Sequence, residues 1–180
     1  KDGHITRAEW DYGRRRFEKG APAPLGAVAG VLHSILEMIE KGATHVGVAT
    51  DHVIESFRND LWDGYKTGEG IDRALWAQFH PLEDALLAMG VAVWPMVELE
   101  ADDGLASAAW IAERDERVEK VCIWSPDKDL AQCVQETRVV GYDRHRKVLL
   151  DASGVVAKFG VPPAAMMETV CTREVPFVVL

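Results

Sequence analysis

Six carboxylates in the sequence share one property: each follows, directly or within a few residues, a short apolar run typical of a buried strand. They are Asp51 after "HVGVAT", Glu100, Asp102 and Asp103 after "VAVW", and Asp127 and Asp129 after "CIWSP". The carboxyl ends of parallel strands meet at one edge of a sheet, so we expect these acids at neighbouring strand ends. Clustered carboxylates repel one another unless a cation neutralises them.

Hard divalent cations such as Mg²⁺ and Mn²⁺ prefer oxygen ligands. Two such ions can activate water and stabilise the leaving oxygen in phosphodiester hydrolysis. Apart from His52, which directly follows Asp51, no histidine or cysteine lies among these acids, which speaks against zinc. Taken singly, however, Asp51, Asp102 or Asp127 would be a typical cap of a helix or turn. The residues and their spacing therefore predict a metal-dependent phosphotransfer or hydrolase site, with capping as the alternative for each acid.

Helices and strands alternate in the predicted secondary structure. Apolar spacing indicates helices over residues 25–42, 82–89, 101–114 and 152–160, and the start of another at 127–132. Short strands are expected at "HVGVAT", "VAVW" and "VEKVCIW", with a hairpin formed by "TRVVGYD" and "RKVLLD". This order predicts an α/β fold with a mainly parallel central sheet covered by helices.

The composition sets limits on location and partners. The chain has 180 residues, which is enough for one domain with its own core. Its net charge of −9 argues against nucleic-acid binding through a general basic surface. Its three cysteines, Cys122, Cys133 and Cys171, form no CxxC pair, which fits a reducing cytoplasm. We expect Cys122 and Cys133 to be small core residues. No apolar stretch approaches the ~20 residues of a membrane span, and no secretory signal is visible.

Three segments together resemble the bacterial 5′–3′ exonuclease and flap endonuclease family, which includes the N-terminal nuclease domain of type I DNA polymerases. These segments are "ATDHVIESFRNDLWDGYKTG", "LEADDGLASAA" and "SPDKDLAQCV". They match, in order, a strand-end Asp with "FR…YK", then "EADD", then "DKDL", and the similarity extends over residues 20–163. The resemblance implies a PIN-like, resolvase-like α/β core in a single nuclease domain over residues 1–180.

The same resemblance implies ligands for two ions of Mg²⁺ or Mn²⁺. Asp51, Glu100 and Asp102 would hold the first ion, and Asp102, Asp127 and Asp129 the second, with Asp103 acting through water. Asp2 lies at a suitable distance before "GRRRFEKGAP" to match a further ligand at the end of the family's first strand. The apolar strand that should carry Asp2 is not visible in the sequence.

Three residues of the polar segment after Asp51 resemble substrate contacts. Arg58 and Lys66 match the family's cationic side chains that steer the scissile phosphate, and Tyr65 matches its neighbouring aromatic residue. Cations beside a carboxylate–metal cluster can stabilise developing phosphate charge, and a tyrosine can stack on an unpaired base. The alternative is a solvated, helix-capping segment.

The resemblance implies metal-dependent hydrolysis of DNA phosphodiesters at 5′ flaps and 5′-ended strands, in the bacterial cytoplasm, with a DNA polymerase as a possible companion. The family's "GDxSDN" motif and its helix–hairpin–helix DNA-binding part are not found in the sequence, so reduced activity is expected. Two alternatives stay open, a nuclease-like module that binds DNA or metal without cleavage, and a PIN-type ribonuclease. The sequence leaves the oligomeric state undetermined.

Overall fold

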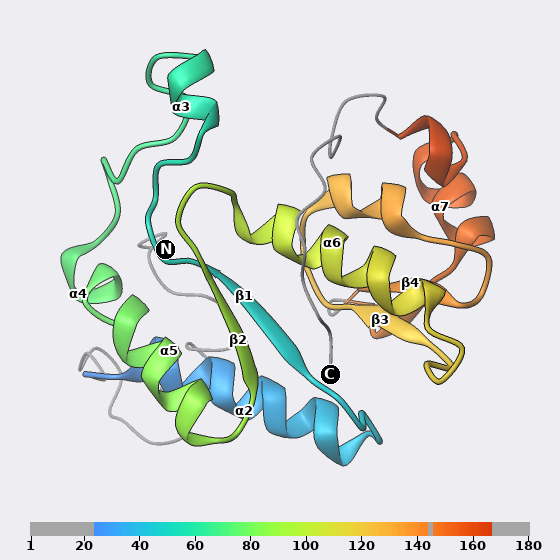
Figure 1. Cartoon of the computed structure of the whole chain (residues 1–180), viewed down its shortest axis with the longest axis horizontal. Coiled ribbons are helices and arrows are strands. Elements are labelled where there is room, and N and C mark those ends of the chain that lie inside the picture. Colours follow the sequence, from blue (N-terminus) through green and yellow to red (C-terminus); the bar gives the residue numbers. More distant parts are fainter. Residues whose placement is uncertain (1–23, 144–145, 167–180) are drawn as a thin grey trace. The chain divides into compact units, whose positions relative to one another are not determined.

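The computed structural model describes residues 24–143 and 146–166 (Figure 1). The chain divides into two compact units, Lys1–Glu100 and Ala101–Leu180. The predicted single nuclease domain stays a prediction. Asp2 and Cys171 lie outside the described residues.

The described residues of the first unit form two parallel strands and four helices. In chain order these are α2 (Gly26–Glu40), β1 (Gly47–Asp51), α3 (Arg58–Leu61), α4 (Arg73–Trp76), α5 (Phe79–Ala88) and β2 (Ala92–Met96). Strands β1 and β2 pair in register from Gly47 opposite Ala92 to Asp51 opposite Met96. A parallel pair needs a long crossover between its strands, and here the crossover contains α3, α4 and α5. Both strands therefore end at the same edge.

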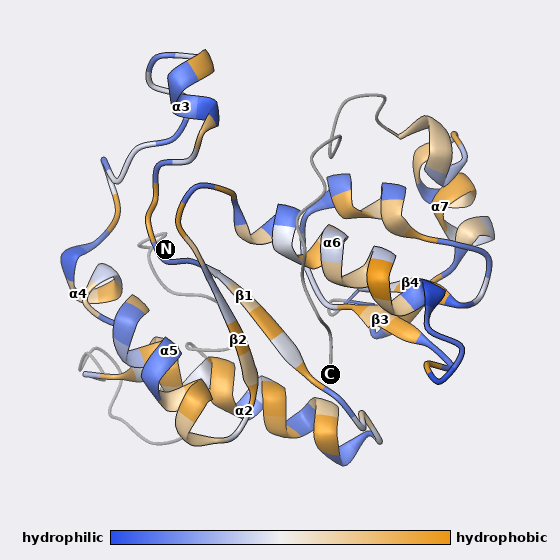
Figure 2. Ribbon diagram, in the orientation of Figure 1, coloured by the Kyte–Doolittle hydropathy of each residue, from blue (hydrophilic) through white to orange (hydrophobic). Residues whose placement is uncertain are grey.

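The core of this unit forms where α2 and α5 meet the strands. Ile35 of α2, Leu86 of α5 and Val91 are buried together, and Val48 and Val93 of the strands pack against them. Hydrophobic residues recur along α2, whereas hydrophilic residues predominate at the start of α3 (Figure 2). The amphipathic spacing of α2 thus holds β1 and β2 in place, and the segment around α3 stands outside the core.

A glutamine supplies the cap that α2 lacks locally. Leu25, which precedes α2, makes no side-chain cap hydrogen bond. The buried Gln78 accepts instead from the backbone N–H groups of Ala27 at 2.9 Å and Val28 at 3.4 Å. Its Nε2 donates to the carbonyl of Ala74 at 2.9 Å. The start of α2 is therefore tied to the junction of α4 and α5.

In the second unit, the residues that the structure describes form a three-stranded sheet with helices. Its elements are α6 (Ala101–Arg114), β3 (Val121–Ile123), the 3-10 helix η1 (Lys128–Cys133), β4 (Val139–Asp143), β5 (Val148–Leu150), α7 (Ala152–Phe159) and the 3-10 helix η2 (Pro163–Ala165). The sheet order is β3-β4-β5, with β3 and β4 parallel and β4 and β5 antiparallel. Ala109 of α6, Ile123, Leu130 and Val139 form one buried cluster. Ala131, Val134 and Val155 form another.

The predicted α/β class and its mainly parallel pairing are confirmed, since among the described strands β1–β2 and β3–β4 pair in parallel and the predicted hairpin, β4–β5, pairs antiparallel. The described strands form two sheets, one in each unit. The prediction that Cys122 is a core residue is wrong, because Ile123 takes the buried position on β3 and its neighbour Cys122 is exposed. Within the described ranges, no helix is long and apolar enough to cross a membrane.

Candidate functional site

Two of the predicted acids lie at the exits of β1 and β2. Asp51 is the last residue of β1, and Glu100 follows the end of β2 by four residues. Backbone hydrogen bonds hold the two exit segments side by side. The N–H of His52 donates to the carbonyl of Met96 at 3.1 Å, and the N–H of Phe57 donates to that of Glu98 at 2.8 Å. The strand ends therefore bring both carboxylates to one edge of the unit.

Each of these carboxylates has a cationic neighbour from the predicted substrate-binding segment. Lys66 Nζ donates to Asp51 Oδ2 at 2.6 Å, and Arg58 Nη1 lies 3.6 Å from Glu100 Oε1. Burial alone would lower the pKa of Lys66, but its hydrogen bond to Asp51 and the charges of Asp51 and Glu100 outweigh burial and raise that pKa. Lys66 is thus a charged side chain that links the two acids electrostatically.

Polar side chains that the sequence analysis missed shape this segment. Ser56 Oγ donates to Glu100 Oε1 at 2.7 Å and accepts from the N–H of Arg58 at 3.3 Å. Asn59 accepts from the N–H of Ser56 at 3.1 Å and donates to the carbonyl of Lys66 at 2.8 Å. These bonds fold the chain so that Arg58 and Lys66 return toward the strand ends. The substrate-contact roles of Arg58 and Lys66 stay predictions, beside the alternative of a solvated, helix-capping segment.

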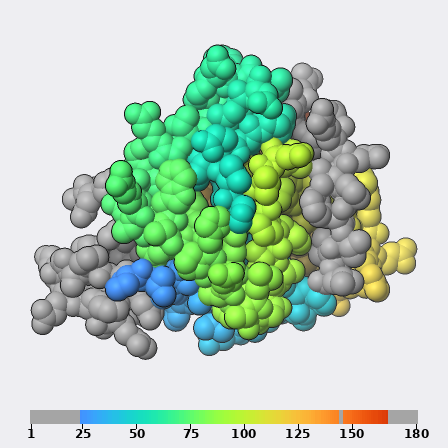
Figure 3. All heavy atoms as spheres, turned by 60° about the vertical axis from the view of Figure 1, so that its left-hand side comes forward, coloured from blue at the N-terminus to red at the C-terminus, as the bar shows by residue number. Residues whose placement is uncertain are grey.

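Tyr65, the predicted aromatic contact, is more exposed than Arg58 and Lys66. Tyr65 is 49% exposed, so its ring is accessible to a ligand. The residues after β1, drawn in teal, form the upper end of the face in Figure 3. An exposed ring next to Lys66 suits stacking, and the structure leaves that role a prediction.

The other four described acids lie in the second unit. Asp102 and Asp103 occupy the first turn of α6, where Asp103 is buried and Asp102 half-buried. Asp127 is exposed and caps η1, since its Oδ1 accepts from the N–H of Asp129 at 2.8 Å. One carboxylate oxygen of Asp127 therefore acts as a helix cap, as the capping alternative predicts. The ligand roles of the six acids stay predictions.

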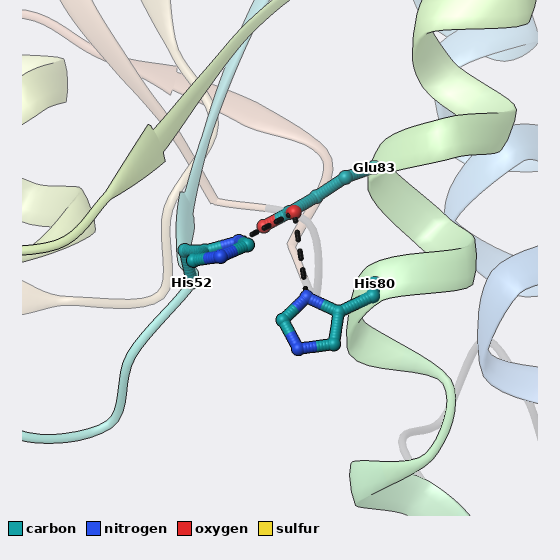
Figure 4. Close-up of side chains that lie close together, drawn as sticks. All are labelled: His52, His80 and Glu83. Carbon is teal, nitrogen blue, oxygen red and sulfur yellow. Dashed lines mark hydrogen bonds and ion pairs between the residues drawn. The ribbon is translucent and has the colours of Figure 1, made fainter.

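A further polar cluster, which the sequence analysis did not single out, joins β1 to α5 (Figure 4). Within the described residues, the one group of three metal-ligating side chains within 4.8 Å of one another is His52, His80 and Glu83, and none of these is a predicted ligand. His52 Nδ1 lies 2.7 Å from Glu83 Oε2, and Thr50 Oγ1 donates to Glu83 Oε1 at 2.6 Å. The sequence signal was the His–x–x–Glu spacing of residues 80–83 on a helix, which places both side chains on one face.

Burial and neighbouring charges shift the pKa of Glu83 in opposite directions. Its side chain is 7% exposed, and burial alone would raise its pKa. Hydrogen bonds from Thr50 and His52, with the charges of His52 and His80, outweigh burial and lower the pKa. Glu83 is therefore a buried carboxylate held in its ionised form by its neighbours.

Comparison with known proteins covers most of the chain. The family model described as the 5′-3′ exonuclease, N-terminal resolvase-like domain, matches residues 4–160. The DNA polymerase I of Rhizobium leguminosarum is 31% identical over 154 residues, which are 81% of this chain and 15% of the polymerase. A 5′-3′ exonuclease of Buchnera aphidicola is 26% identical over 170 residues, which are 93% of this chain and 58% of the exonuclease. The chain therefore spans only part of these relatives.

Solved structures share the fold. A T5 protein co-crystallised with metal ions has a TM-score of 0.58 at 17% identity, covering 86% of this chain and 58% of its own. The flap endonuclease of bacteriophage T5, in a pseudo-enzyme–product complex with DNA and metal ions, has a TM-score of 0.52 at 18% identity, covering 83% and 57%. The predicted α/β, resolvase-like core is thus confirmed. With the match over residues 4–160, this chain belongs to the family of 5′-3′ exonuclease N-terminal, resolvase-like domains.

Proposed function

We propose that this chain carries the hydrolytic centre of a divalent-metal-dependent 5′–3′ exonuclease and flap endonuclease that cleaves DNA phosphodiesters. The observation that carries the proposal is the paired arrangement in the first unit, where Asp51 and Glu100 at adjacent strand exits each have a cationic neighbour from the following segment. Family membership supports the reaction class, and the structure supports the placement of these four side chains.

The donor set fits Mg²⁺ or Mn²⁺. Asp51 and Glu100 offer carboxylate oxygens, the ligand type these ions prefer. In the second unit, Asp102, Asp103, Asp127 and Asp129 offer the same chemistry, and Asp2 completes the proposed set. The ions would supply an activated water and charge stabilisation for the leaving oxygen. Two similar T5 structures contain metal ions, which supports metal dependence.

Arg58 and Lys66 are proposed to bind the scissile phosphate. In this structure Lys66 Nζ lies 2.6 Å from Asp51 Oδ2, where a metal ion bound to Asp51 would lie. With a metal ion held at Asp51, the ammonium group of Lys66 would contact the phosphate instead, where a preorganised positive charge stabilises the developing negative charge. Tyr65, exposed beside Lys66, is proposed to stack on an unpaired base near the 5′ end.

The proposed substrates are 5′ flaps and 5′-ended DNA strands, and the proposed setting is the bacterial cytoplasm. One T5 relative binds DNA in its solved complex, and one curated relative is a DNA polymerase I, so a polymerase is a proposed companion.

Cleavage of a 5′-labelled flap substrate by the chain tests the proposal. We expect products that require Mn²⁺ or Mg²⁺, disappear with chelator and are lost in Asp51→Asn. Asp84→Asn is the matched control, because Asp84 is an exposed acid on α5 of the same unit. DNA binding without cleavage would favour the non-cleaving module, and selective cleavage of RNA would favour the PIN-type ribonuclease. Either result would overturn the proposal.

A further inference from the structure

The cluster of His52, His80 and Glu83 brings two imidazoles and a carboxylate to one point. His52 directly follows β1, and His80 and Glu83 lie on one face of α5 (Figure 4). Glu83 Oε2 lies 2.7 Å from His52 Nδ1 and 3.8 Å from His80 Nδ1, and the two ring centroids are 4.5 Å apart. All three ligand atoms fall within 4.8 Å of one another.

The carboxylate at the centre is held in a fixed orientation. Glu83 is buried, and its other oxygen, Oε1, accepts from Thr50 Oγ1 at 2.6 Å. The backbone N–H of His52 donates to the carbonyls of Thr50 at 3.0 Å and Met96 at 3.1 Å, which fixes the base of that side chain. A hydroxyl bound to the non-ligating oxygen is the kind of supporting contact that orients carboxylate ligands in metal sites.

Hydrogen bonding explains the contact of Glu83 with His52 but not its contact with His80. The 2.7 Å contact is a hydrogen bond from His52, but 3.8 Å between Glu83 Oε2 and His80 Nδ1 is too long for one. Tetrahedral zinc with bonds of ~2.0–2.1 Å separates its ligand atoms by ~3.3 Å, a value between these two distances. The His80 side chain is 60% exposed, so it can rotate to close the longer gap.

We propose that His52, His80 and Glu83 bind a divalent transition metal of the zinc class, with three protein ligands and the fourth position open to water. Two histidines and one glutamate are a ligand set that zinc accepts in this open form. Imidazole nitrogen also selects zinc-class ions over Mg²⁺, which prefers oxygen alone. His52 and Asp51 are adjacent in the chain but contact different side chains. Asp51 forms an ion pair with Lys66, and His52 forms a hydrogen bond with Glu83. The site is therefore chemically distinct from the proposed hydrolytic centre.

A metal bound here would cross-link the end of β1 to α5. Those elements are joined through a crossover of residues 52–78, so the bound ion would oppose their separation. A ligand that binds only the folded state stabilises that state in proportion to its concentration over its Kd. Zinc should therefore raise the melting temperature of the chain.

Metal titration of the tag-free chain tests this site. Co²⁺ is the spectroscopic probe, because four-coordinate nitrogen and oxygen ligation gives strong visible absorption and six-coordinate oxygen ligation gives weak absorption. Zn²⁺ should displace Co²⁺ and raise the melting temperature. His80→Gln should lower Zn²⁺ affinity by at least about tenfold and abolish the strong Co²⁺ absorption. Because His80 is exposed, this variant avoids the risk of misfolding that Glu83→Gln carries in a buried position.

His33→Gln is the matched control, since His33 is an exposed histidine on α2 of the same unit. It should leave Zn²⁺ affinity and the Co²⁺ spectrum unchanged. Mn²⁺ affinity should be the same in His80→Gln and the native chain, which separates this site from the acidic one. Three results would each overturn the proposal: no Zn²⁺ binding by the native chain, only weak six-coordinate Co²⁺ absorption, or native Zn²⁺ affinity in His80→Gln.

Discussion

Replacing Lys66 by methionine tests whether its ammonium group stands in for a metal ion at Asp51. The substitution keeps most of the apolar stem and removes the charge. Lys66 Nζ lies 2.6 Å from Asp51 Oδ2, with side-chain exposures of 32% and 28%. A charge-assisted hydrogen bond of this kind, weakened by partial solvent screening, is worth about 1 kcal/mol. We expect Lys66→Met to lower the free energy of unfolding by that amount in chelator-treated buffer.

Divalent metal should reverse this loss. If a cation occupies the position that Lys66 leaves, saturating Mn²⁺ should stabilise Lys66→Met by about 1 kcal/mol more than it stabilises the native chain, because the native ammonium competes with the ion. The assay is urea unfolding followed by circular dichroism, with and without Mn²⁺. Flap cleavage by the variant should fall even where its stability is restored, because the phosphate has lost a positive charge.

Lys41→Met is the control for this experiment. Lys41 Nζ pairs with Glu37 Oε1 at 2.8 Å on α2, and both side chains are more exposed, at 48% and 40%. Its loss should change stability by no more than about 0.5 kcal/mol, with no dependence on Mn²⁺. Equal stabilisation of the native chain and Lys66→Met by Mn²⁺ would refute the reasoning.

Three further predictions follow from single contacts. Gln78→Ala should lower the free energy of unfolding by about 2 kcal/mol in urea melts, because it removes the acceptor of the half-buried Ala27 N–H and the buried Val28 N–H at the start of α2. A loss below about 0.5 kcal/mol would contradict that role. Ser56→Ala should cost about 1.5 kcal/mol in the same assay by removing the hydroxyl donor of Glu100, and an unchanged midpoint would count against it. The side-chain hydrogen bond from Arg117 lowers the pKa of Asp115 to about 2, so Arg117→Ala should return it toward 3.8 in an NMR titration. The stability from that contact is present above pH 3.8 and lost as the pH falls through about 2, and an Asp115 pKa that stays near 2 in the variant would disprove the assignment.

Local patterns predicted the elements and the acids at their ends. The helix predicted over residues 101–114 matches α6, and Asp51 ends β1 as expected, because apolar periodicity and strand boundaries depend on neighbouring residues. The contacts that shape the candidate site join residues far apart in the chain. Gln78 caps a helix that begins about 50 residues earlier, and Ser56 binds Glu100 across 44 residues.

The histidine–glutamate cluster illustrates the same limit. Spacing places His80 and Glu83 on one face of α5, but only the packing of α5 near the end of β1 brings His52 to them, 31 residues away from Glu83. The exposure of Cys122 also depends on which face of β3 the core covers, and a three-residue strand carries too short an alternation to fix that face. Register and tertiary packing, rather than local pattern, decide these features.

Calorimetric titration of Mn²⁺ into the chain tests most directly whether Asp51 and Glu100 hold one divalent cation. We expect Asp51→Asn and Glu100→Gln each to weaken Mn²⁺ binding by at least about tenfold, since each removes a ligand. The double variant should lose less than the sum of the two single losses, because residues that share one partner are not additive. Asp84→Asn should bind Mn²⁺ like the native chain. Absence of Mn²⁺ binding by the native chain, or native affinity in both single variants, would contradict the account.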